Sequence, residues 1–83
     1  MKRSRQEIIS QILEICVDGA SKTKIVYQAN LNFKMVNPYI DLLIKNGLIQ
    51  VNEGRAIVYE TTPKGIGLIE SIKRVHDKLL DPP

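Results

Sequence analysis

The sequence has no tryptophan, and aromatic residues make up only 5% of its 83 residues. A hydrophobic core must therefore be built mainly from aliphatic side chains. The single cysteine, Cys16, cannot form an internal disulfide and has no cysteine partner for a metal site. No apolar run approaches the ~18 residues that span a membrane, and the basic N-terminus does not resemble a secretory signal. We expect a cytoplasmic protein without membrane association, metal or cofactor.

Groups that carry out catalysis are also scarce. The chain has one histidine and one cysteine, scattered carboxylates and no glycine-rich phosphate loop. We therefore expect that the protein is not an enzyme and has no small-molecule substrate.

Positive charge is present, and it is unevenly placed. The net charge is +3, and residues 1–45 hold seven basic side chains against four acidic ones, whereas the two signs balance after Lys45. This excess favours a polyanionic partner, although a lysine-rich surface that only keeps the protein soluble remains an alternative.

Residues 4–19 have the pattern of a first helix. Ser4 followed by Glu7 has the spacing of a capping box, and Gly19 is a suitable end. One face is apolar and includes Cys16, so we expect a packed core thiol rather than a reactive one. The apolar positions are Ile8, Ile9, Ile12, Leu13 and Cys16.

Residues 21–47 predict two more helices joined by a tight turn. Ser21 can cap the first, Asn30-Leu31-Asn32 forms the turn with Leu31 buried, and Asn32 can cap the second. We predict one helix over residues 33–46 that continues through Pro38, where it is locally kinked or loosened, and ends at Gly47. Its inward face comprises Phe33, Val36, Ile40, Leu43 and Ile44.

The segment LIQVNEGRAIVYETT, residues 48–62, predicts a β-hairpin. Strands are expected over residues 48–51 and 55–61, with the turn at 52–54 and Ile57 and Tyr59 on one face. Thr62-Pro63 then starts a last helix, which residues 81–83 stop. The fold class is mainly α with a small β-hairpin (α+β), a winged helix-turn-helix with a C-terminal dimerisation helix. We expect residues 1–62 to form the winged helix-turn-helix domain and residues 63–83 to form a coiled-coil dimerisation helix packed on it.

The last helix has two apolar stripes. Ile66 and Ile69 lie early enough to pack against the winged domain. A second stripe, spaced four, three and four residues apart, has the pattern of a coiled-coil seam and predicts a homodimer. The alternative is that this helix folds back and buries both stripes on its own domain. The seam residues are Leu68, Ile72, Val75 and Leu79.

A winged helix usually places its second helix-turn-helix helix, here residues 33–46, in the DNA major groove. This helix has no arginine, so we expect weak sequence preference and a large electrostatic share of the affinity. The candidate contacts on the two helices and the hairpin loop are Lys22, Lys24, Tyr27, Gln28, Asn32, Lys34, Asn37 and Arg55. The alternative is a protein-interaction adaptor without DNA binding, which the acidic Asp41 and Glu53 favour.

Three segments resemble a known family: GASKTKIVYQANLNFK (residues 19–34), YIDLLIKNGLI (39–49) and YETTPKG (59–65). They are similar to the archaeal winged-helix DNA-binding family that includes the ten-kilodalton chromatin-associated proteins. The resemblance implies a dimer held by an antiparallel coiled coil of the last helix, with a winged domain at each end. It also implies binding to double-stranded DNA, a transcription-regulating or chromatin role, and a nucleoid location.

Overall fold

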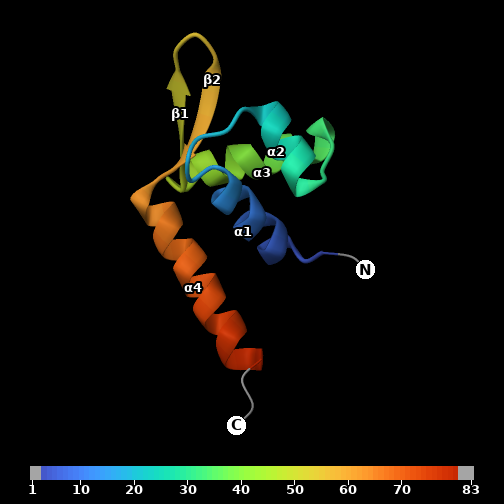
Figure 1. Ribbon diagram of the computed structural model, residues 1–83, viewed down its shortest axis with the longest axis vertical. Coiled ribbons are helices and arrows are strands. Elements are labelled where there is room, and N and C mark those ends of the chain that lie inside the picture. Colours follow the sequence, from blue (N-terminus) through green and yellow to red (C-terminus); the bar gives the residue numbers. More distant parts are fainter. Residues whose placement is uncertain (1–2, 81–83) are drawn as a thin grey trace.

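The computed structural model describes residues 3–80, with side chains described as far as residue 75. The described residues form α1 (Arg5–Ile15), α2 (Lys22–Ala29), α3 (Phe33–Lys45), β1 (Ile49–Glu53), β2 (Ile57–Thr61) and α4 (Pro63–Leu80). Figure 1 shows α1, α2 and α3 packed together, with the hairpin and α4 projecting from this cluster in opposite directions. This is the α+β winged-helix arrangement that the sequence predicts.

The helices begin at the predicted caps. Each capping oxygen accepts a hydrogen bond from the backbone N–H three residues later, which satisfies one of the unpaired donors at a helix start. The Ser4 and Ser21 bonds are 3.1 Å long, and the Asn32 bond is 2.8 Å long. The Thr62 hydroxyl accepts from the N–H of Gly65 at 3.1 Å, which confirms the predicted start of α4. The predicted stop at residues 81–83 lies outside the described residues.

Helix α1 ends earlier than predicted. Its last residue is Ile15, and Gly19 (φ +85°) lies beyond a turn rather than at the helix end. The backbone carbonyls of Leu13 and Cys16 accept hydrogen bonds from Thr61 on β2, at 2.6 and 3.0 Å. Strand β2 therefore satisfies carbonyls at the end of α1, so a further helical turn is not needed.

Helix α3 continues through Pro38 as predicted, and Val36, Ile40 and Leu43 are buried. Phe33 was expected to face inward, but 49% of its surface is exposed. It is the first residue of α3, ahead of the first buried turn, and Leu31 from the preceding turn enters the core instead.

The hairpin turn lies later than predicted. β1 pairs antiparallel with β2 as far as Glu53 opposite Ile57, so residues 54–56 make the turn instead of residues 52–54. The Asn52 side chain donates a 3.2 Å hydrogen bond to Glu60 on β2, which fits a strand position. Ile57 and Tyr59 share one face, but Ile57 near the loop is exposed whereas Tyr59 is buried.

The core joins all of these elements. Ala20 and Tyr59 exchange two backbone hydrogen bonds of 2.9 and 2.8 Å, which fix the hairpin to the segment between α1 and α2. Cys16 is fully buried in this core, as predicted, and Ile69 enters it from α4. No helix in the described part of the chain is long and apolar enough to cross a membrane.

Candidate nucleic-acid interface

The positive charge is concentrated on the helix-turn-helix. Residues 22–45, which include α2 and α3, contain four lysines and one acidic residue, Asp41. This segment alone therefore accounts for the formal net charge of +3 of the whole chain. None of the four lysines forms an ion pair with a carboxylate among the described residues. An excess of positive charge of this kind attracts a polyanion.

The solvent-exposed side of helix α3 carries both polar and apolar residues. Its buried row of Val36, Ile40 and Leu43 fixes the opposite side as the exposed one. Lys34 and Asn37, the predicted groove contacts, are both exposed. Asn32 is exposed too, but its side-chain oxygen Oδ1 already accepts the capping hydrogen bond from Met35 N–H. The side-chain nitrogen Nδ2 is therefore the group of Asn32 that is left to donate to a phosphate.

Helix α2 adds the predicted contacts Lys24, Tyr27 and Gln28, all exposed; Tyr27 exposes 80% of its surface. Lys22 is different, because it is half-buried and its Nζ lies 5.8 Å from the ring centroid of Tyr59. A cation over an aromatic face is attracted to it, so Lys22 is partly engaged within its own domain.

Arg55 does not join the α2–α3 group. It is exposed in the hairpin loop, which projects beyond the helices (Figure 1). A contact through Arg55 would therefore be separate from those of α3.

Two cations stabilise helix ends, and residue patterns alone do not identify this role. Arg3 donates to the backbone carbonyls of Ala29 and Asn30, the latter at 3.0 Å, and to Gln11 at 2.7 Å. Lys64 donates to the carbonyl of Asn46, at the end of α3, at 2.8 Å. Cations bind well to the free carbonyls at helix C-termini. These carbonyls are 18 to 27 residues away from Arg3 and Lys64 along the chain, so local sequence patterns could not pair them.

The predicted seam of α4 is only partly exposed. Val75 exposes 53% of its surface, whereas Leu68 and Ile72 are half-buried and Leu68 packs partly against its own core. The side chain of Leu79 lies outside the described part of the chain. Ile69 is buried as predicted, but Ile66 is 40% exposed and is not part of the buried core. Both residues line an open pocket.

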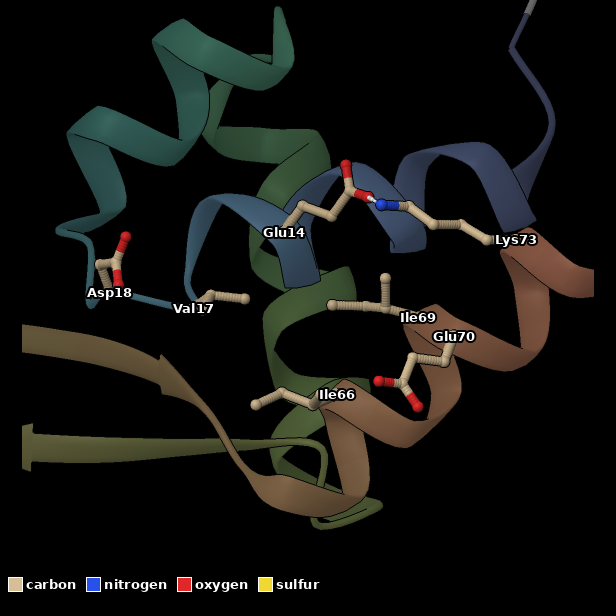
Figure 2. Close-up of a pocket in the computed structure, with 7 residues that line it drawn as sticks. All are labelled: Glu14, Val17, Asp18, Ile66, Ile69, Glu70 and Lys73. Carbon is tan, nitrogen blue, oxygen red and sulfur yellow. Dashed lines mark ion pairs between the residues drawn. The ribbon is translucent and has the colours of Figure 1, made fainter.

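That pocket, of about 540 Å³, lies between α4 and the end of α1 (Figure 2). Lys73 Nζ is 2.9 Å from Glu14 Oε1 across it, which links α4 to α1. The α4 residues that line the pocket lie on one flank of α4, and the seam residues Leu68 and Val75 lie on the other. A second α4 packed on the seam would therefore leave the pocket open. The lining residues are Glu14, Val17, Asp18, Ile66, Ile69, Glu70 and Lys73.

A family model described as winged helix-turn-helix matches residues 2–80. The chain belongs to the winged helix-turn-helix family. Two uncharacterized proteins of the archaeon Methanocaldococcus jannaschii are similar to it. MJ0287 is 42% identical over 72 residues, which cover 86% of this chain and 71% of that protein. MJ0290 is 41% identical over 76 residues, which cover 90% of this chain but only 35% of that longer protein.

Among solved structures, the fold is similar to the crystal structure of Sso10a-2, a DNA-binding protein from Sulfolobus solfataricus. The TM-score is 0.77 at 27% sequence identity, and the match covers 98% of this winged helix-turn-helix chain and 100% of Sso10a-2. These matches confirm both the winged-helix fold and the archaeal resemblance that the motifs indicated.

Proposed function

We propose that this protein binds double-stranded DNA as a homodimer, as a transcription regulator or chromatin-associated protein and not as an enzyme. The observation that carries the proposal is the concentration of the whole formal net charge on α2 and α3. The family and the description of Sso10a-2 as a DNA-binding protein support it.

In this proposal α3 lies in the major groove. Lys34 and Asn37 contact base edges or phosphates, and the Asn32 amide lies near a phosphate at the helix start. Asp41 is exposed further along the helix and repels phosphates, so the phosphate contacts of α3 come from its first turns. Phosphate contacts from such lysines give affinity without sequence information.

The neighbouring elements hold the DNA backbone. Lys24, Tyr27 and Gln28 on α2 are exposed and contact phosphates, while Arg55 reaches an adjacent groove from the hairpin loop. Lys22 contributes less, because its ammonium group already lies over Tyr59.

We assign residues 63–83 to dimerisation. Val75 is exposed, and Leu68 and Ile72 are half-buried on the same flank of α4, so a second copy has apolar surface to cover. A coiled-coil seam of this spacing joins two winged domains, each of residues 1–62.

Two double variants with equal charge change test the DNA proposal. Lys24→Ala with Lys34→Ala removes two cations from the proposed interface. Arg5→Ala with Arg74→Ala removes two exposed cations from α1 and α4. Fluorescence anisotropy with a labelled duplex should show a large loss of affinity for the first pair on every sequence and little change for the second. A wild-type protein that binds no duplex would contradict the proposal and favour the adaptor function.

A further inference from the structure

Helix α3 has an apolar stripe on its exposed side. Met35 and Leu42 expose 45% and 37% of their surfaces, and Pro38 between them is also exposed. Their spacing of three and four residues places them on one helix face. That face is turned away from the buried row of Val36 and Ile40. Exposed apolar residues grouped on one helix face are candidates for contact with a ligand or partner.

The surroundings of this stripe limit what can cover it. Lys34 and Lys45 are exposed on the same side of α3, at its two ends, with Asp41 between them, so the side carries a net positive charge. This charge favours a ligand that offers negative charge beside an apolar group. Duplex DNA provides both, because phosphates border the major groove and thymine presents its C5-methyl group inside it. That methyl group is the apolar feature by which base pairs differ in the major groove.

We infer that Met35, Pro38 and Leu42 contact thymine methyl groups in the major groove, so that the protein prefers thymine-containing sites. The inference rests on the proposed DNA binding and adds the chemistry of base recognition to it. Helix α3 has no arginine, so only its lysines could make the contact with guanine that arginine or lysine commonly provides. Apolar contact with thymine then adds a second source of sequence preference.

Replacing thymine by deoxyuridine in one duplex tests this directly, because it removes the methyl group and keeps all charges and Watson–Crick hydrogen bonds. Wild-type protein should bind the thymine duplex more tightly, by about fourfold for each methyl group that it buries. Met35→Ala with Leu42→Ala should bind both duplexes equally and should match the wild type on the deoxyuridine duplex. Val17→Ala, which shortens an exposed side chain in the turn after α1, should keep the wild-type preference.

The possible results separate the inference from the proposed function. Equal wild-type affinity for the two duplexes would overturn the inference alone and would favour a protein partner for the stripe. A preference that persists in the Met35→Ala, Leu42→Ala variant would also overturn it, since DNA shape would then be its cause. Failure to bind either duplex would overturn the proposed function and the inference together.

Discussion

The hydroxyl group of Thr61, the last residue of β2, donates a 2.6 Å hydrogen bond to the backbone carbonyl of Leu13 in α1. Thr61 is the one buried polar residue in the described part of the chain. Leu13 lies in the last turn of α1, where carbonyls have no partner within the helix. A side chain from the hairpin thus completes the hydrogen bonding of the first helix.

Thr61→Val should therefore destabilise the fold. The variant keeps the shape of the side chain but leaves the Leu13 carbonyl buried without its donor, at a cost of about 1–3 kcal/mol. Thr61→Ser keeps the hydroxyl group and should keep most of the stability. Thr23→Val makes the same change at an exposed position of α2 and should have little effect on the free energy of unfolding. Urea unfolding measures all three. A Thr61→Val midpoint equal to that of the wild type would contradict the role of this bond.

Two glycines of α4 should respond to alanine in opposite directions. A methyl group on Gly65 would collide with the carbonyl oxygen of Leu48 and lie 2.6 Å from Thr61 Cγ2, whereas one on Gly67 would meet nothing within 4 Å. Gly65→Ala should lower the free energy of unfolding by about 1–3 kcal/mol through overpacking. Gly67→Ala should raise it by about 0.5–1 kcal/mol, because alanine favours the helix. The same sign for both variants would show that the contact of Gly65 with Leu48 is not tight.

The parts of the fold that depend on residues close together along the chain could be predicted from the sequence. The caps at Ser4, Ser21 and Asn32 act over three residues, and the buried positions of α3 follow its helical period. The end of α1 could not be predicted in this way, because it depends on hydrogen bonds with Thr61, 48 residues from Leu13. The hairpin turn was misplaced because the strand pairing continues to Glu53 opposite Ile57, which residue preferences alone do not fix.

The candidate interface shows the same division. The exposure of Lys24, Lys34 and Asn37 follows from helical periodicity. The engagement of Lys22 with Tyr59 and the contact of Arg3 with Asn30 depend on tertiary packing, and both cations look available in the sequence. Met35 and Leu42 were not among the candidate contacts, and the structure shows that the buried row of Val36, Ile40 and Leu43 leaves both of them exposed.

The buried thiol of Cys16 should make stability depend on alkaline pH. Burial raises the pKa of this thiol from 9.0 to about 11, although the positive charge of Lys24 acts in the opposite direction. The unfolded chain therefore loses the thiol proton near pH 9 while the folded chain keeps it. The contribution of the neutral thiol is fully present below pH 9 and is lost as the pH rises towards 11.

Comparison with Cys16→Ala isolates this effect from the titration of other groups. The difference in free energy of unfolding between the wild type and the variant should shrink between pH 9 and 11. Guanidinium unfolding at a series of pH values measures it. A difference that stays constant over this range would contradict a raised thiol pKa.

The dimer proposal can be tested at one exposed seam position. Val75→Asp places a charge where a second α4 would pack, and an unpaired charge in an interface opposes association. Analytical ultracentrifugation should show a dimer for the wild type and a monomer for this variant. Arg74→Asp, on the other side of the helix, should remain dimeric. A wild-type monomer at high concentration would contradict the proposed seam.

The central claim is that the lysines of α2 and α3 bind DNA phosphates, and the salt dependence of duplex binding tests it most directly. A log–log plot of affinity against salt concentration should have a slope of about −0.9 for each phosphate neutralised. The Lys24→Ala, Lys34→Ala variant should lose about 1.8 from the magnitude of this slope, and the Arg5→Ala, Arg74→Ala variant should keep the wild-type value. A wild-type slope near zero, or one slope shared by all three proteins, would contradict the account.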